Sequence, residues 1–322
     1  VFPSEPGGNI KELGVFNRTV SANYGMSYSV SNVLVDAGFE NVSRWVPFKA
    51  DETELRNAVK NKMVRPTTVP QTLESLVLEQ ALSREALRMS FGQHKSLAVG
   101  LKGVAQRRTI GEAFEQTRTG ESLISMMHLN LLVGSGGILS HAPRRSQAAM
   151  MMIDGFQPEG FTYLAVDSIF MMPQLGVLSE INYQAAKEVF EKDCLIRLGS
   201  LVAPAGQGNE GEACATIKVT PIRAKMAAEE LKMPCGQMKV LPLDIEEEVE
   251  VTVTPARKFD MGEGNGKPVT RKLKGGVVGL MIDCRGRPLA LPSDDAKRVA
   301  KLKEWFAAFD LYPRLDFSGG AT

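Results

Sequence analysis

The feature that most constrains the fold is a strand, a glycine turn, a helix and a second strand within residues 129–166. Residues 129–133 are a short apolar run that ends in Gly134-Ser135-Gly136-Gly137, and residues 161–166 form a second apolar run. Pro143 suits the first turn of a helix between them. The pattern predicts a βαβ unit with its glycines at the carboxyl end of a strand, where open α/β sheets bind ligands.

The glycine turn itself permits two interpretations. Glycine lets the backbone approach a ligand closely, and amides at a helix start favour an anion or a polar ligand edge. A dinucleotide fingerprint would need glycine or alanine at position 139, where Leu139 stands, so that version fails. On spacing alone, a nucleotide contact at residues 134–137 and a tight turn without a ligand both stay open.

Four polar residues near this turn have a ligand-binding and a structural interpretation. His141, Arg144 and Arg145 could approach a phosphate or a ribose, but we favour solvated residues at a helix start. Asp167 follows the second strand and could hold a ribose or a metal-bound water. We favour a structural role for Asp167 as a cap for Ser168 and the following turn.

Composition excludes several classes of function. Of 322 residues, 43% are hydrophobic and 23% are charged, which is typical of a globular chain and not of a disordered one. Lys and Arg number 38 against 37 Asp and Glu, so a net charge of +1 gives no case for nucleic acid or an anionic membrane. The sequence also lacks the roughly 18–20 consecutive apolar residues of a membrane span.

The cysteines and histidines do not have the spacing of metal ligands. No C-x-x-C occurs, and the few histidines are distant from the cysteines, whereas zinc needs clustered ligands. We therefore expect no metal site, and reduced buried thiols in a cytoplasmic protein. The residues concerned are Cys194, Cys214, Cys235, Cys284, His94, His128 and His141.

The chain divides into three parts that differ in residue composition and in the secondary structure they predict. Residues 1–14 are rich in turn formers and read as a linker or a truncated end, residues 15–200 as helices with two strands, and residues 201–322 as a β-rich domain with a terminal helix. Because the chain starts with Val1, we expect that it begins partway through a larger protein. The alternative is a removed initiator or transit segment.

Helix signals in the first part are local. A helix over residues 25–37 should end at Gly38, and Asp51 should start a second helix that ends before Pro66. Thr68 and Gln71 have capping-box spacing and predict the start of a long buried helix. Three methionine runs, at 126–127, 150–152 and 171–172, suit either an adaptable surface or core filling, and we favour core filling.

The β-rich part has clearer signals. Val249, Val251 and Val253 alternate with polar residues, which predicts a strand with one wet face. Asn265-Gly266 predicts a two-residue hairpin, and residues 276–283 an apolar strand, within an antiparallel sheet or small barrel. Ser293-Asp294-Asp295 should cap a last helix.

Residues 262–267 contain three glycines and a lysine, but they do not form a phosphate loop. That pattern needs glycine where Met261 stands and Ser or Thr where Pro268 stands.

Several segments resemble one protein family over nearly the whole chain. The chain is similar there to MutL, the ATPase-like accessory protein of adenosylcobalamin-dependent glutamate mutase, which is unrelated to the mismatch-repair protein of that name. The similar segments are residues 18–28 (RTVSANYGMSY), 133–142 (VGSGGILSHA), 164–178 (LAVDSIFMMPQLGVL) and 275–283 (GGVVGLMID).

The resemblance implies the second lobe of an actin-like ATPase fold, of the type found in sugar kinases and heat-shock chaperones, followed by a β-rich C-terminal domain. It implies that Gly134, Ser135, Gly136 and Gly137 contact the adenosine of ATP or ADP, with magnesium as the accompanying ion. Asp167 is the associated candidate at the next strand end. The implied partners are subunits of the mutase and an N-terminal lobe upstream of Val1.

One departure from the family pattern limits the expected chemistry. No Asp-x-Gly-x-Thr-like phosphate turn occurs in the sequence, so no catalytic residue or metal ligand can be assigned, and ATP hydrolysis by this chain alone is not expected. The leading hypothesis is a fragment of a nucleotide-binding accessory or reactivation protein for the mutase. The alternatives are an interaction or assembly module that uses the lobe as a scaffold, and a kinase-like enzyme for a small metabolite, with Asp167 as its only candidate carboxylate.

Overall fold

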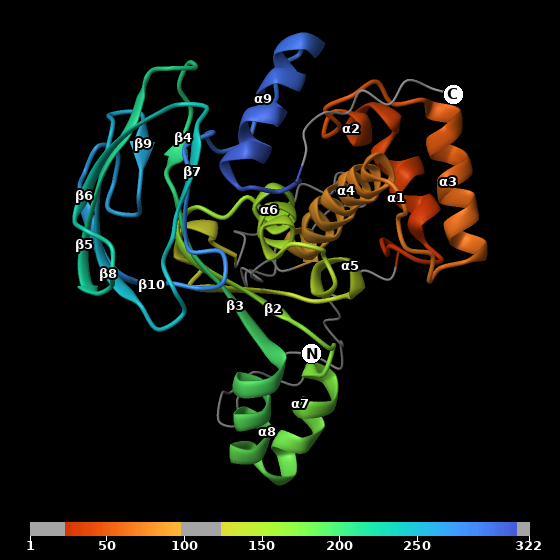
Figure 1. Ribbon diagram of the computed structural model, residues 1–322, viewed down its shortest axis with the longest axis horizontal. Coiled ribbons are helices and arrows are strands. Elements are labelled where there is room, and N and C mark those ends of the chain that lie inside the picture. Colours follow the sequence, from red (N-terminus) through yellow and green to blue (C-terminus); the bar gives the residue numbers. More distant parts are fainter. Residues whose placement is uncertain (1–22, 98–123, 314–322) are drawn as a thin grey trace, which may run out of the picture.

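The computed structural model describes residues 23–97 and 124–313, which form three layers around a central mixed sheet (Figure 1). The predicted end segment 1–14 and residues 18–22 of the first similar segment lie outside this part. None of the described helices is long and apolar enough to cross a membrane.

The central sheet has five strands in the order β1-β2-β3-β11-β7. The strands are β1 Leu131–Gly134, β2 Gly160–Asp167, β3 Leu195–Ala203, β7 Met238–Leu241 and β11 Leu280–Asp283. β1 is parallel to β2, and β3 is parallel to β11, whereas the β2–β3 and β11–β7 pairs are antiparallel. The predicted βαβ unit is therefore confirmed, inside a sheet that is mixed.

Helices cover one face of this sheet. They are α1 Val30–Ala37, α2 Phe39–Ser43, α3 Glu52–Val64, α4 Leu73–Leu97, α5 Gly137–Ser140, α6 Arg145–Phe156 and α9 Asp295–Ala308. The core between them contains Leu164 and Val166 of β2 and Met281 of β11. Met150–Met152 of α6 are fully buried there, which confirms their role as core filling.

A four-stranded antiparallel sheet covers the other face, with the order β10-β8-β5-β6. Its strands are β5 Ala213–Arg223, β6 Glu229–Pro234, β8 Glu248–Pro255 and β10 Val269–Lys274, and the short strands β4 Ala205–Gly206 and β9 Phe259–Asp260 pair nearby. The three predicted inward valines of β8 are fully buried, against Leu280 and Ile282 of β11. The described strands form an open antiparallel sheet, so of the two predicted forms the sheet is correct.

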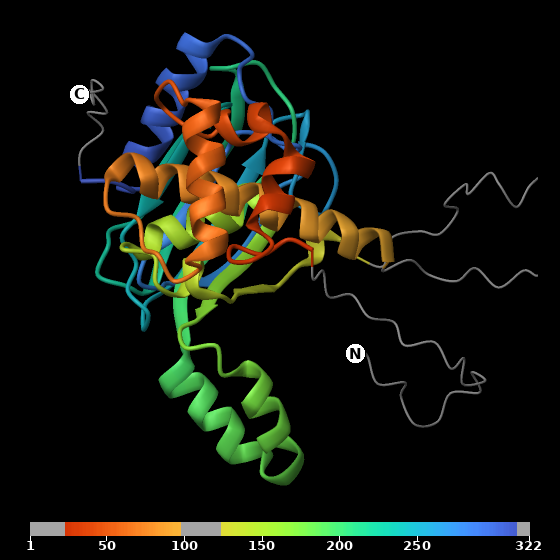
Figure 2. The same ribbon diagram turned by 90° about the vertical axis from the view of Figure 1, so that its right-hand side faces the viewer.

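Two helices project away from these layers as a hairpin between β2 and β3 (Figures 1 and 2). They are α7 Met172–Ile181 and α8 Tyr183–Val189, followed by one π-helical turn, Phe190–Cys194. Their own small core is centred on Leu175, Ala186 and Cys194.

Several helix ends agree with the sequence, and others differ. The Asp51 carboxylate accepts the amide of Glu54 at 2.8 Å at the start of α3, as predicted, and Asp294 caps α9. α1 ends before Gly38 as expected but begins at Val30, because the preceding residues form a turn.

Two predicted helix starts are wrong. α4 begins at Leu73 and not at Thr68, because Pro70 keeps the preceding residue out of the helical region. Thr72 takes over the capping role, since its hydroxyl accepts the amide of Ser75 at 3.1 Å. Pro143 lies before α6, which begins at Arg145, because the turn leads first into the short α5.

The predicted two-residue hairpin at Asn265-Gly266 is also wrong. Gly266 adopts a positive φ of 73°, and a turn closes between Lys267 and Gly264, but β8 and β10 are joined by the whole of residues 256–268. This connection turns aside to form β9, and the Asp260 carboxylate then accepts two backbone amides within it. Similarly, strand β11 begins at Leu280, later than the predicted start at residue 276.

The glycine-rich segment 275–279 crosses β3 with backbone packed on backbone. A Cβ at Gly199, which has a φ of 133°, would lie 1.9 Å from the carbonyl oxygen of Gly279, and a Cβ at Gly276 would lie 2.3 Å from the Leu198 carbonyl carbon. Val278 donates its amide to the carbonyl of Leu198 at 2.9 Å. Only glycine permits this crossing, which links the first part of the chain to the β-rich part.

A buried ion network links α4, α6 and β11. Asp154 of α6 pairs with Arg84 of α4 at 2.7 Å and with Arg285 at 2.8 Å. Asp283, at the end of β11, pairs with Arg285 at 2.9 Å and with Arg287 at 2.8 Å. All five side chains are at most 1% exposed. The network therefore pairs three buried cations with two buried anions.

The predicted division at residues 200 and 201 falls within β3, which is continuous from Leu195 to Ala203. The division into three parts stays a prediction.

We expect Asp283→Asn to lower the free energy of unfolding at pH 7 by about 3–5 kcal/mol, because two buried guanidinium groups lose their shared anion. Urea denaturation measures the change. The matched control is Asp244→Asn, whose side chain is 73% exposed in its ion pair with Lys225, and it should cost less than about 1 kcal/mol.

The same comparison depends on pH. Burial alone would raise the pKa of Asp283, but the charges of Arg285 and Arg287 outweigh it and hold that pKa well below its usual value. A carboxylate whose pKa is lower in the folded than in the unfolded state stabilises the fold at every pH above its unfolded pKa, which is about 4 for aspartate. This stabilisation is lost as the pH falls from there toward the folded-state pKa. The gap between the native chain and Asp283→Asn should therefore shrink below pH ~4. Equal unfolding free energies at pH 7 would contradict a stabilising network.

We expect Gly199→Ala to destabilise the fold by more than about 3 kcal/mol, because the new methyl group meets backbone atoms and the φ is unfavourable for alanine. Thermal and urea unfolding measure the loss. Gly176→Ala is the control: it lies within α7, its Cβ would meet nothing within 4 Å, and it should stabilise by about 0.5–1 kcal/mol. Equal stability of the two variants would show that the crossing can relax.

Candidate functional site

The parallel pairing of β1 and β2 places the glycine turn beside the end of β2. Gly134 lies opposite Val166 in the register, so the turn and Asp167 lie at the same sheet edge. The Ser140 hydroxyl, at the end of α5, donates to the carbonyl oxygen of Asp167 at 2.6 Å. The structure thus brings together the residues that the sequence singled out.

The three glycines of the turn have different local surroundings. A Cβ at Gly134 would lie 2.7 Å from the sulfur of Met152, so this glycine permits the close packing of β1 against α6. Gly136 has a φ of 103°, and at both Gly136 and Gly137 a Cβ would meet nothing within 4 Å. Gly136 is needed for the turn, and together with Gly137 it leaves an open backbone surface.

Ser135 contributes the side-chain hydroxyl of the turn. Its Oγ is buried and has no hydrogen-bond partner among the described residues. Residues 23–97 and 124–313 therefore do not use this donor and acceptor.

Asp167 is fully buried, and its carboxylate accepts three backbone amides at the start of α7. The donors are Ile169 and Met171 at 3.3 Å and Met172 at 3.1 Å. Ser168 is held differently, because its amide donates to the carbonyl of Cys194 at 2.8 Å. Asp167 therefore anchors the base of the α7–α8 hairpin, and its role toward a ligand stays a prediction.

The two arginines after the turn bind other parts of the chain. Arg144 pairs with the Asp310 carboxylate at 2.6 Å, and Arg145 donates to the carbonyl of Ser140 at 2.6 Å. His141 is exposed. Arg144 therefore contacts the segment after α9, and Arg145 contacts the end of α5.

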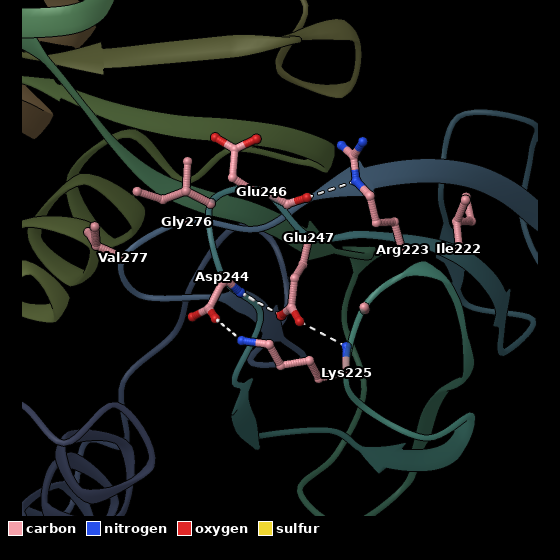
Figure 3. A pocket seen from close by; sticks show the side chains of 10 residues that line it. Ile222, Arg223, Lys225, Asp244, Glu246, Glu247, Gly276 and Val277 are labelled. Atoms are coloured by element: carbon pink, nitrogen blue, oxygen red, sulfur yellow. Dashed lines mark hydrogen bonds and ion pairs between the residues drawn. The ribbon is translucent and has the colours of Figure 1, made fainter.

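Three of the hollows among the described residues are well defined, and none of these three is lined by residues 134–137 or by Asp167. The candidate adenosine surface is therefore an open sheet edge and not one of these hollows. The largest of the three, of about 940 Å³, lies between loops 222–225 and 244–247 and the segment at Gly276 (Figure 3).

The charged groups of this largest hollow bind one another. Figure 3 shows the Glu247 carboxylate between the backbone amides of Lys225 and Asp244, at 2.8 and 2.9 Å. These hydrogen bonds, from Asp244 first, lower the pKa of Glu247. Arg223 donates to the carbonyl of Glu246 at 3.0 Å. The polar side chains thus hold two loops together.

The described residues contain no group of three or more potential metal ligands. The four cysteines are buried free thiols. Burial, with Cys214 close by, raises the pKa of Cys235 to about 11, so this thiol is not a nucleophile at neutral pH.

Two features of the surface were missed from the sequence. One is the exposed apolar side of the α7–α8 hairpin, whose signal was the apolar composition of residues 169–181. The other is a basic hollow that includes Arg197 and Arg271, whose signal was the cationic run at residues 271–274.

We expect Asp167→Ala to lower stability by about 1–3 kcal/mol, because three amides at the base of the hairpin lose their acceptor. Amide hydrogen exchange should then quicken in α7 and α8 but not in α4. Asp193→Ala removes an exposed carboxylate from the same hairpin and should leave exchange unchanged. Unchanged protection of α7 in Asp167→Ala would refute the anchoring role.

Comparison with known proteins gives one match. No curated protein and no solved structure matches the chain. The family model described as MutL protein matches residues 3–194, which include the glycine turn, Asp167 and the α7–α8 hairpin. Because the match covers more than half of the sequence, the chain belongs to the MutL protein family of glutamate mutase accessory proteins.

Proposed function

We propose that this chain is the adenosine-binding part of an accessory protein that serves adenosylcobalamin-dependent glutamate mutase. The observation that carries the proposal is the glycine turn at the carboxyl ends of two adjacent parallel strands. Ligands of α/β sheets bind at such edges. Family membership supports the mutase as the partner.

The backbone at Gly136 and Gly137 provides a surface for the flat edge of the adenine ring, because neither glycine has a side chain that would cover it. Ser135 contributes to the turn through its backbone, because its Oγ is buried and is not part of this surface. Asp167 fixes the neighbouring strand end, and we assign it a role in shaping the ribose side. The exposed backbone at this turn supports adenosine binding through backbone hydrogen bonds.

Phosphate and magnesium contacts are not part of this proposal for the chain. The acidic glycine turns that grip phosphates in actin-like proteins have no counterpart in the 322 residues. We propose that residues 15–200 correspond to the second lobe of such a protein. Nucleotide would then bind one arrangement of the two lobes more tightly than the other. This difference would shift the populations of the two arrangements while the protein acts on the mutase.

A second function is favoured by the exposed apolar surface of the α7–α8 hairpin. Val177 is 69% exposed, Ile181 84% and Tyr183 68%, on an element that projects from the body of the protein. Contiguous exposed apolar residues mark protein interfaces. An interaction or assembly module would contact mutase subunits there without nucleotide turnover. No comparable observation favours a small-metabolite kinase, because the carboxylate of Asp167 is occupied by backbone amides.

Calorimetric titration with ADP and Mg²⁺ tests the nucleotide proposal. We expect micromolar-range binding by the native chain and roughly tenfold weaker binding by Gly137→Val, whose side chain would cover the open surface without a steric clash. Gly92→Val is the control, since it makes the same change at another helical glycine with open surroundings.

Each outcome separates the two functions. Loss of binding in Gly137→Val alone supports adenosine at the turn. Absence of binding by the native chain would overturn the nucleotide proposal and leave the interaction module as the better account.

A further inference from the structure

A groove of about 650 Å³ follows the open edge of strand β10. Four successive residues of this strand line it: Arg271, Lys272, Leu273 and Lys274. Successive side chains of a strand point to opposite faces, so four in a row can line a groove only along the edge of the strand. β10 is the last strand of its sheet and, within the described part, pairs as a strand only with β8. Side chains cover part of its other edge, because Ser200 donates to the carbonyl of Lys274 and Arg271 to that of Thr270.

The opposite wall of the groove is partly apolar. It includes Phe161 and Tyr163 of β2, together with Met127 and Met261. The Tyr163 hydroxyl donates to the carbonyl of Gly275 at 2.8 Å, and burial raises its pKa, so the ring stays neutral. A chain segment lying here could bury apolar side chains on this wall.

The charges that line the groove are mostly positive. Arg197 joins the cations of β10, and Glu263 is the one carboxylate among the lining residues. Arg197 makes one 3.3 Å hydrogen bond to the carbonyl of Glu191, and Arg271 lies 3.7 Å from Glu263 with both side chains more than half exposed. The net charge of the chain is only +1, so this excess is local.

The paired edge of β10 shows which kind of strand complements it. In the β8–β10 register, Lys272 lies opposite Glu250 and Lys274 lies opposite Glu248. Glutamates alternate with valines in this part of β8. Cations on an edge strand discourage pairing with neutral or basic strands, whereas opposite charges across a pair stabilise it.

We propose that the groove binds an extended acidic segment of a partner protein, which adds to β10 as a further strand. Backbone hydrogen bonds to β10 would give affinity, and carboxylates near Arg197 and Arg271 would give specificity. The groove borders the first residues of β2, whereas the glycine turn lies beside its last. The proposal is therefore independent of nucleotide binding.

The test uses a fluorescent peptide with the sequence of residues 246–255, which is the acidic strand that β10 already accepts. A peptide with glutamine in place of each glutamate is its control. Fluorescence anisotropy with the full chain should show binding of the acidic peptide, weakened by high salt. Binding should be roughly tenfold weaker for the glutamine peptide and for the variants Arg197→Glu and Arg271→Glu.

Lys187→Glu is the matched protein control, because it reverses an exposed cation on α8, outside the groove. Circular dichroism checks that each variant is folded, and Arg271→Gln replaces any variant that is not. Bound peptide should also slow amide exchange in β10. Equal affinity of all variants, binding without protection of β10, or binding of pyrophosphate but not of the peptide would each overturn the proposal.

Discussion

The buried network around Asp283 and Arg285 is the constraint on which the layered structure depends. Its five side chains come from α4, α6, the last residue of β11 and the segment after it, and the guanidinium of Arg285 also stacks on Trp305 of α9, 4.8 Å from the ring centre. Charges at most 1% exposed are tolerable only while every partner is in place. Helices from both ends of the described chain are therefore fixed to the central sheet as one unit.

Features set by neighbouring residues could be predicted from the sequence. The βαβ unit, the wet and buried faces of β8 and the caps at Asp51 and Asp294 depend on periodicity or on contacts three residues apart. The misplaced starts at Thr68 and Pro143 show the limit of such signals, because Pro70 excludes a start at Thr68 and the short helix α5 takes up the chain before α6. The two-residue hairpin failed because Phe259 and Asp260, within the connection between β8 and β10, pair with the distant β4.

Contacts between distant residues could not be predicted in this way. Arg84 and Asp154 are 70 positions apart, and Arg287 bonds to the carbonyl of Pro158 across 129 positions. At the candidate site, spacing placed the glycines and Asp167 at one edge correctly. The favoured role of Asp167 as a cap for the following turn was also correct. Spacing could not show that Ser168 is held by Cys194 instead, because that depends on the path of the chain after the strand.

The way the α7–α8 hairpin is inserted has a consequence for the modularity of the protein. β2 and β3 are neighbouring antiparallel strands whose register closes at Asp167 and Leu195, so the whole excursion begins and ends at one rung of the ladder. A short turn could bridge that rung without moving either strand. The register of the sheet therefore does not depend on the helices of the excursion, which is structurally separable from the strands that carry it.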